Sequence, residues 1–294
     1  MTNLLACGAC PAGASGLVAA RWRARGRATM RQTSELVFAT YLAPSIRPAY
    51  HFVASRVGDA LRQPVRLVTG ESLDQLRNGE VDFAFLCGLP YVKLRREPRQ
   101  PVSLVAAPVL EGDRYDGRPI YFSDVIVPAD SSMTAFEELR GRSWACNGFD
   151  SHSGTLVVLH HLLKMGEDGR FFGHVQVSGS HQQSIRLVAD GEIDGSAIDS
   201  QVLAVELRDH PDLRERVRVI DSLGPSTNMP LVAGAACEGL RREVGEVVAG
   251  LGTEETDRDG LASGLFSGFV EIDDPAYDDI RDMLDSVKAA GLRF

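Results

Sequence analysis

Residues 147–155 read Asn147-Gly148-Phe149-Asp150-Ser151-His152-Ser153-Gly154-Thr155 and lie between a short apolar run and the longer apolar segment 156–163. The segment that follows has helical length and contains no helix breaker, so the stretch predicts a turn from a strand into a helix. A helix start exposes N–H groups without partners, and neighbouring hydroxyls with a glycine suit a small anion. A simple N-cap by Asp150, Ser151 or Ser153 explains the same residues and is favoured on the local pattern alone.

The composition is that of a soluble globular protein. The chain has 294 residues, enough for one large domain or two of ordinary size, and is 44% hydrophobic and 24% charged. Its formal net charge of -9 argues against nucleic acid or an anionic membrane as the main partner. It does not argue against a small anionic ligand, because local donors outweigh distant charges that salt screens.

Cysteine and histidine usage predicts neither a disulfide framework nor a metal site. The cysteines number five, and apart from the pair in residues 7–10 they are widely spaced. Cys87 and Cys146 lie in apolar, strand-like runs, where cysteine usually behaves as a small buried hydrophobe. The adjacent histidines at 160–161 cannot share one face of a helix. Because no familiar catalytic motif occurs either, we expect no metal and no cofactor.

Residues 1–34 differ from the rest of the chain. They lack the apolar stretch of about 7–15 residues that a signal peptide needs, and their arginines follow the apolar part instead of preceding it. We expect a disordered leader, or a start codon assigned too early with Met30 as the real start. No run in the chain reaches the ~18 apolar residues of a membrane-spanning helix.

From Glu35 onward strands alternate with helices, which predicts an α/β protein with parallel strands. Strands are expected within residues 36–39, 65–68, 81–86, 102–109, 121–128, 144–146, 175–178, 191–200, 217–220 and 266–270. Helices are expected within residues 46–61, 72–77, 131–140, 156–163, 185–189, 201–207, 238–250 and 275–290, with another after Gly88. Residues 224–233 are expected to form a loop that enters a strand.

Two segments about half a chain apart share one local design. Residues 77–84 and 189–196 each run from a helix end through a turn, a Gly-Glu pair, an apolar residue and an Asp into a strand. Their separation is far beyond the ~20–50 residues of a solenoid repeat. Two similar α/β lobes explain this repetition, and a cleft between two lobes is a favoured place for a small ligand.

Three segments, taken in order, carry a family resemblance: Asp150–Gly154, Ser178–His181 before a helix, and Gly191–Asp194 followed by Ala197–Asp199. Together they resemble the substrate-binding proteins of phosphate, phosphite and phosphonate ABC transporters, over roughly residues 36–285. The resemblance implies a type 2 periplasmic binding protein: an α/β fold with two similar lobes of mixed or parallel sheet, flanked by helices, and a ligand cleft between them. It places residues 35–123 and 225–294 in one lobe and residues 124–224 in the other.

The resemblance also implies a function. A protein of this kind closes on a small oxyanion, such as phosphonate, phosphite or phosphate, for an ABC importer and performs no catalysis. In the family the hydroxyl-rich turn and the helix start after it bind the phosphoryl oxygens. That role falls here on Ser151, Ser153 and the N–H groups around Gly154 and Thr155, while His152 stands where the family commonly has Ser or Thr.

Other candidate ligand contacts come from other strand ends. His181 matches the family's histidine before the helix of the second lobe, and Tyr121 matches a tyrosine in the strand that enters that lobe. Asp199 follows a strand where the family carries polar ligand contacts, and it can alternatively cap the next helix. As a carboxylate it can accept a P–OH hydrogen and repel a fully ionised, sulfate-like group. Tyr41 and Tyr91 lie at strand-to-helix turns, where they line the cleft or pack in the core.

By resemblance the partner is an ABC permease, the location periplasmic or at the cell surface, and the protein a monomer. The lack of a recognisable signal peptide leaves a cytoplasmic location as the alternative. An enzyme on the same two-lobe fold then becomes the second hypothesis, since relatives of this architecture act in thiamine-pyrimidine and menaquinone-precursor synthesis. His181 with Asp199 would form its catalytic pair. A cytoplasmic ligand sensor is a third hypothesis.

Overall fold

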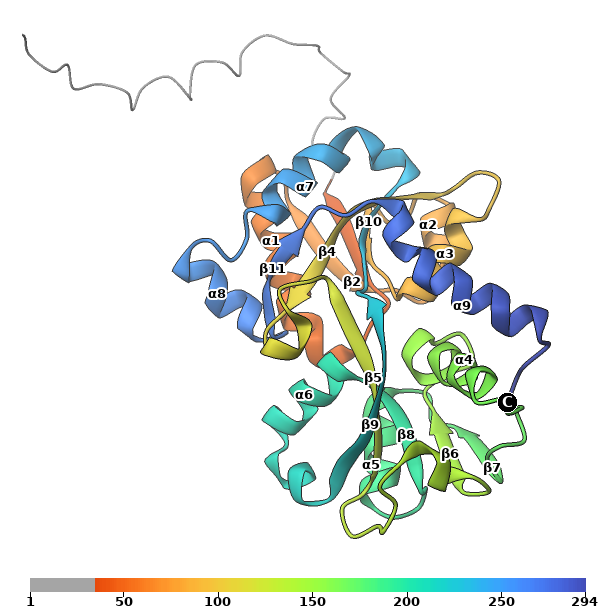
Figure 1. Cartoon of the computed structure of the whole chain (residues 1–294). Coiled ribbons are helices and arrows are strands. Elements are labelled where there is room, and N and C mark those ends of the chain that lie inside the picture. Colours follow the sequence, from red (N-terminus) through yellow and green to blue (C-terminus); the bar gives the residue numbers. More distant parts are fainter. Residues whose placement is uncertain (1–34) are drawn as a thin grey trace, which may run out of the picture. The chain divides into compact units, whose positions relative to one another are not determined.

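Two mixed β-sheets flanked by helices organise residues 35–294, which are the residues that the computed structural model describes (Figure 1). The expectations for residues 1–34, a leader or an early start codon, lie outside the described residues. The described part is a single compact unit. None of its helices is long and apolar enough to span a membrane.

Lobe 1 is built on a six-stranded sheet with the strand order β11-β4-β10-β3-β1-β2. Its strands are β1 (Leu36–Thr40), β2 (Val65–Thr69), β3 (Phe83–Phe85), β4 (Val102–Leu110), β10 (Leu231–Gly234) and β11 (Phe266–Val270). Its helices are α1 (Arg47–Leu61), α2 (Asp74–Arg77), α3 (Gly88–Arg95), α7 (Arg241–Ala249), α8 (Glu255–Ala262) and α9 (Asp278–Ala289). One face of the sheet packs under α1, α7 and α8, and the other under α3 and α9.

Lobe 2 is built on a five-stranded sheet with the order β7-β6-β8-β5-β9. Its strands are β5 (Ile120–Pro128), β6 (Ser143–Cys146), β7 (His174–Val177), β8 (Gly195–Asp199) and β9 (Val217–Thr227), and its helices are α4 (Val157–Lys164), α5 (His181–Ala189) and α6 (Ser200–Asp209). In both lobes a central strand pairs in parallel with two neighbours, β1 with β2 and β3, and β6 with β7 and β8. The remaining strands pair antiparallel, so the sheets are mixed, and the expectation of parallel strands holds only for these triplets.

The chain passes between the lobes on two neighbouring strands, which Figure 1 shows as the paired arrows β5 and β9. Lobe 2 pairs β8 with β5 only from Ser123 to Ile126, so the first residues of β5 extend past that sheet. There they pair with the last residues of β9, Ile120 with Thr227 and Tyr121 with Ser226. A two-stranded ribbon therefore joins the lobes.

The repeated design found in the sequence is repeated in three dimensions. Gly79 and Gly191 both turn the chain after a helix with a φ of +71°. The carboxylate of Asp82 accepts the N–H of Val37 on β1 at 2.8 Å. That of Asp194 accepts the N–H of Ser143 on β6, also at 2.8 Å, so each aspartate fastens its strand to the central strand of its lobe.

Two local expectations were wrong. Residues 131–140 hold only a short 3-10 helix, Phe136–Leu139, because Glu138 turns back to accept the N–H groups of Thr134 and Ala135 and thereby starts the helix late. The loop expected at 224–233 is shorter, since β9 continues to Thr227 through its pairing with β5. In addition, the segment between α7 and β11 contains a separate helix, α8, that the sequence pattern did not predict.

Candidate ligand-binding site

A cleft of about 310 Å³ lies where the strands of both lobes end. Its walls come from the turns after β1, β3, β6, β7 and β8 and from Met229 in the segment between β9 and β10. The lining residues are Tyr41, Leu42, Ala43, Pro44, Ile46, Cys87, Pro90, Asn147, Gly148, Asp150, Ser151, Ser153, Gly179, Ser180, His181, Gln182, Asp199, Val202 and Met229. The carboxyl ends of parallel strands are the usual ligand site of open α/β sheets, and both lobes turn that edge toward the same cleft.

The turn between β6 and α4 forms one wall of the cleft. Residues 152–156 make a single π-helical turn that continues into α4. The Ser151 hydroxyl accepts the N–H of Gly154 at 3.1 Å, and the Thr155 hydroxyl donates to the carbonyl of Gly148 at 2.8 Å. A Cβ at Gly154 would collide with the amide oxygen of Asn147, so any other residue there would require Asn147 to move. Ser151 thus caps the helix while still lining the cleft, and its hydroxyl hydrogen remains available to a ligand.

A second helix start faces the first. Ser180 caps α5 by accepting the N–H of Gln183 at 3.1 Å. His181, the first residue of α5, places its Nε2 3.0 Å from the Ser153 hydroxyl. Its Nδ1 is buried and has no hydrogen-bond partner among the described residues. Burial lowers the pKa of His181 to about 4, so in the ligand-free cleft the imidazole is neutral and holds one N–H and one lone pair.

Asp199 supplies a buried carboxylate to the cleft. It is 3% exposed and caps α6, because its Oδ1 accepts the N–H groups of Gln201 at 2.8 Å and Val202 at 3.2 Å. Burial raises the pKa of Asp199 to about 7, although these two N–H groups act in the opposite direction. Asp199 therefore both caps the helix, as one alternative predicted, and lines the cleft. It can hold a proton near neutral pH.

His152 and Tyr121 lie behind the wall of the cleft and do not line it. His152 is fully buried, neither ring nitrogen has a hydrogen-bond partner within residues 35–294, and burial lowers its pKa to about 3. The Tyr121 ring lies 6.1 Å from that imidazole, centroid to centroid. Its hydroxyl is buried beside Ser153 without a well-formed hydrogen bond to the described residues. Both side chains thus support Ser153 from behind.

The structure separates the two remaining tyrosines. Tyr41 lines the cleft, and its hydroxyl donates to the carbonyl of Ser72 at 3.1 Å. Tyr91 is fully buried and donates to Asp274 at 2.5 Å, on the far side of α3. It lines a larger, charged hollow of about 490 Å³ on lobe 1 instead. Four carboxylates line that hollow against two arginines, so it is a poor site for an anion, and we place the site in the cleft.

Two contacts between the lobes close the edges of the cleft. The Gln182 amide donates to the Ser45 hydroxyl at 3.0 Å, and the Lys93 ammonium lies 2.5 Å from the Asp150 carboxylate. Of these four residues the sequence pattern singled out only Asp150, as a possible cap. Such pairs form between elements remote in sequence, and no local pattern marks them.

The sequence pattern also did not place Cys87 in the cleft, although the repeated design of the two lobes could have indicated it. It follows Asp82 at the same spacing as Asp199 follows Asp194, so the repeated design places both residues at a strand end and helix start. Cys87 lines the cleft from lobe 1. Burial raises the pKa of its thiol, and nearby N–H groups, that of His152 first among them, partly offset this. At neutral pH the residue is a thiol.

The cleft offers hydrogen-bond donors but no cationic side chain, since none of the described residues that line it is an arginine or a lysine. Hydroxyl groups and the N–H groups of two helix starts can bind oxyanion oxygens without adding net charge. Within the described part of the chain no group of three or more His, Cys, Asp or Glu side chains is placed to hold a metal ion. The arrangement fits recognition of a small oxyanion.

Comparisons with known proteins also indicate a protein family that binds small oxyanions. A family model described as "ABC transporter, phosphonate, periplasmic substrate-binding protein" matches residues 36–277. Among solved structures, PhnD1 from Prochlorococcus marinus (MIT 9301) in complex with methylphosphonate is 17% identical with a TM-score of 0.75, over 86% of this chain and 98% of that chain. A binding protein component of an ABC phosphonate transporter from Pseudomonas aeruginosa is 17% identical with a TM-score of 0.74, over 87% of each chain.

A third similar structure is a protein from Xanthomonas citri bound to ATP, which is 16% identical with a TM-score of 0.65, over 87% of this chain and 98% of that chain. At these identities the solved structures show the two-lobe fold, which confirms the predicted fold class. A comparison with curated proteins finds no match. The family match ends before α9, and it spans every described strand of both lobes and all the strand ends that line the cleft.

Proposed function

The chain belongs to the periplasmic substrate-binding proteins of phosphonate ABC transporters, and from this premise we propose how its cleft binds a ligand. The phosphoryl group of a small phosphonate lies between the start of α4 and the start of α5. Its oxygens accept hydrogen bonds from Ser151, Ser153 and the exposed N–H groups of the two helix starts. His181 donates through its Nδ1, the nitrogen left without a partner among the described residues.

The observation that carries this proposal is the 3.0 Å contact between Ser153 and His181. It joins the two helix starts at one point, so donors from both can reach the same oxyanion. A bound anion stabilises the protonated imidazole, because opposite charge raises the pKa of a histidine. The cleft therefore acquires a positive charge only when it holds the ligand.

Asp199 gives the cleft a preference for a protonated oxyanion. When it is ionised its free oxygen accepts a P–OH hydrogen, and when it is neutral it donates to a P–O oxygen. Either way one proton lies between the carboxyl group and the ligand. A fully ionised sulfate-like group has no proton to offer, so Asp199 repels it at a pH above about 7, where the carboxylate is ionised. We propose that this proton separates phosphonates, phosphite and phosphate from sulfate.

The two-stranded connection between the lobes can act as a hinge for lobe closure. Ser123 pairs with Leu223 across β5 and β9, so the sequence boundaries at 123/124 and 224/225 lie side by side on the ribbon. We propose that this ribbon is the hinge, and that the contacts of Gln182 with Ser45 and of Lys93 with Asp150 form on closure. The closed protein, as a monomer, delivers its ligand to an ABC permease and does not transform it.

Calorimetric titration with methylphosphonate, phosphite, phosphate and sulfate tests the proposal. We expect submillimolar or tighter binding of at least one of the first three and no measurable binding of sulfate. The bound ligand should raise the melting temperature, as any ligand of the native state does. Mass spectrometry after incubation should recover the ligand unchanged. No binding of any phosphorus oxyanion, or conversion of the ligand to product, would contradict it.

A further inference from the structure

A second cavity, of about 400 Å³, lies behind the wall of the ligand cleft. The loop of residues 147–151 separates the two: Asn147, Gly148, Asp150 and Ser151 face the cleft, whereas Phe149 faces the second cavity. The first turn of α3 divides in the same way, with Pro90 toward the cleft and Leu89 toward the cavity. The cavity is thus a separate space from the cleft, and a ligand there does not compete for the same residues.

The floor of this cavity is apolar and comes from both lobes. α3 and α9 contribute from lobe 1, and the start of α4 contributes from lobe 2, where α4 and α9 lie side by side (Figure 1). The apolar lining residues are Leu89, Phe149, Leu156, Leu159, Leu284, Val287, Leu292 and Phe294. Phe149 is 62% exposed, the highest value among the large apolar side chains described as exposed. A space of this size and lining is within the usual range for a small organic ligand.

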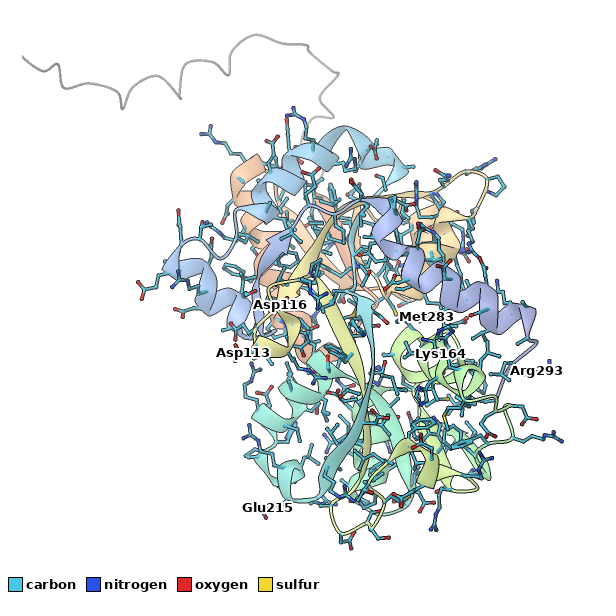
Figure 2. The ribbon with its side chains drawn as sticks, in the orientation of Figure 1. Asp113, Asp116, Lys164, Glu215, Met283 and Arg293 are labelled. Carbon is cyan, nitrogen blue, oxygen red and sulfur yellow. The ribbon has the colours of Figure 1, made fainter. Side chains whose placement is uncertain are left out.

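The charged residues of this cavity all have one sign. Lys93, Lys288 and Arg293 line it, and no Asp or Glu side chain of the described residues does, although Lys93 also forms the ion pair with Asp150 at the edge of the cleft. This bias is notable in a chain with 40 acidic and 31 basic residues. Lys288 and Arg293 are exposed, and Figure 2 shows Arg293 at the outer edge beyond the end of α9. The cations therefore stand at the rim of an apolar space, where long basic side chains can keep their charge in water.

We propose that this cavity binds an amphiphilic organic anion, namely a medium-chain aliphatic carboxylate. The alkyl chain lies on the leucines of α3, α4 and α9, and the carboxylate meets Lys288 and Arg293 at the rim. Charge complementarity selects an anion over a neutral or cationic amphiphile. Because the walls belong to both lobes, the occupant bridges them.

Titration calorimetry with decanoate, below its micelle concentration, tests the proposal. We expect saturable binding with one site, and the same single site should bind decanoate in saturating methylphosphonate, because the two ligands occupy different spaces. Affinity should rise about threefold to fourfold per methylene from hexanoate to decanoate, as expected for burial of each CH₂. Decan-1-ol should bind more weakly than decanoate, and decyltrimethylammonium more weakly still. No saturable binding, competition with methylphosphonate, or tighter binding of the cation would overturn the proposal.

Surface variants locate the site without disturbing the core. Phe149→Asp and the pair Lys288→Glu with Arg293→Glu should each weaken decanoate binding at least tenfold. The matched controls are Val219→Asp, an exposed apolar residue on β9, and Lys164→Glu, an exposed lysine on α4 outside this cavity. Both controls should bind as the wild type does. Equal effects of variants and controls contradict the proposal. So does concentration-dependent dimerisation that Phe149→Asp abolishes, because a second copy would then be the occupant.

Discussion

Cys87 in lobe 1 and Asp199 in lobe 2 occupy equivalent positions in the two lobes. Each follows a turn glycine with the same φ, an aspartate that fastens the strand, and the strand itself, and each precedes a helix that begins at the cleft. The two side chains differ entirely in chemistry. The thiol adds apolar surface to the cleft, whereas the carboxyl group adds a proton that can be gained or lost near neutral pH.

The whole cleft shows the same difference between an apolar lobe 1 and a polar lobe 2. Lobe 2 supplies most of the polar side chains, among them Ser151, Ser153, Ser180, His181 and Asp199. Lobe 1 supplies mainly aromatic and apolar surface, from Tyr41 to Ile46 and from Cys87 and Pro90. The lobes therefore share a backbone design but present different chemistry to the cleft, from which we infer that lobe 2 binds the ligand first and lobe 1 covers it. Variants in matched positions of the two lobes can test this asymmetry.

The largest effect is expected at His181. Removing a hydrogen-bond donor to a charged ligand costs about 1.5–3 kcal/mol, so His181→Ala should weaken methylphosphonate binding about 100-fold. The matched change in lobe 1 is Ser72→Ala, which removes a hydroxyl at the turn after β2 that accepts the N–H of Asp74. Calorimetry should find its affinity within about twofold of wild type. Comparable losses from both variants would contradict the different roles of the lobes.

Asp199→Asn should stabilise the ligand-free protein at pH 8 by about 2 kcal/mol. The folded-state pKa of Asp199 is raised to about 7 from a usual value of 3.8, so folding takes up a proton between these values. The wild type therefore loses stability as pH rises from 4 to 7, and Asn, which does not ionise, does not. Urea unfolding at pH 4.5 and pH 8 measures this. Cys87→Ser, the equivalent change in lobe 1, keeps Asp199, so its difference in stability from the wild type should be the same at both pH values.

Asp82→Ala and Asp194→Ala should destabilise the protein equally, by about 1–2 kcal/mol each. Both carboxylates accept a backbone N–H of the central strand of their lobe at 2.8 Å. Urea midpoints measure the two losses, and the unfolding slope should stay unchanged. A loss of stability at only one of the two positions would show that the two aspartates share a geometry but do not contribute equally to the free energy of unfolding.

The smallest effect is expected at the salt bridge across the cleft. Lys93 and Asp150 are 40% and 89% exposed, and exposed ion pairs contribute at most about 1 kcal/mol. Lys93→Ala should therefore weaken ligand binding by less than about fivefold, and less at high salt. A loss that persists at a salt concentration of about 1 M would mean that Lys93 acts through a contact other than this ion pair. Lys164→Ala serves as the control.

The sequence predicted the fold because its signals were local and repeated. Strand positions, the two-lobe architecture and the repeated Gly-Glu-x-Asp turn could all be read from short windows. The helix expected at 131–140 failed because one glutamate, Glu138, satisfies the backbone N–H groups upstream and delays the helix start. A propensity sum over the segment does not contain that interaction.

The candidate ligand-binding residues differ in how far the sequence could predict their positions. Ser151 and Ser153 could be proposed because helix starts have sequence signatures, whereas His181 was proposed through the family resemblance. Tyr91 could not be separated from Tyr41, because its direction depends on Asp274, far along the chain. His152 belongs to the turn that forms the wall of the cleft, yet its ring is buried behind Ser153 and does not line the cleft. Side-chain direction within one turn is decided by packing, and a single sequence does not encode it locally.

The order of strands in lobe 1 has a consequence for synthesis of the chain. β10 lies in the middle of that sheet, between β3 and β4, yet it follows the whole of lobe 2 in the sequence. The growing chain therefore makes all five strands of the lobe 2 sheet before it makes β10. Until then β3 and β4 have unpaired edges, which are prone to association with other chains. The lobe that begins first is thus the last to be completed.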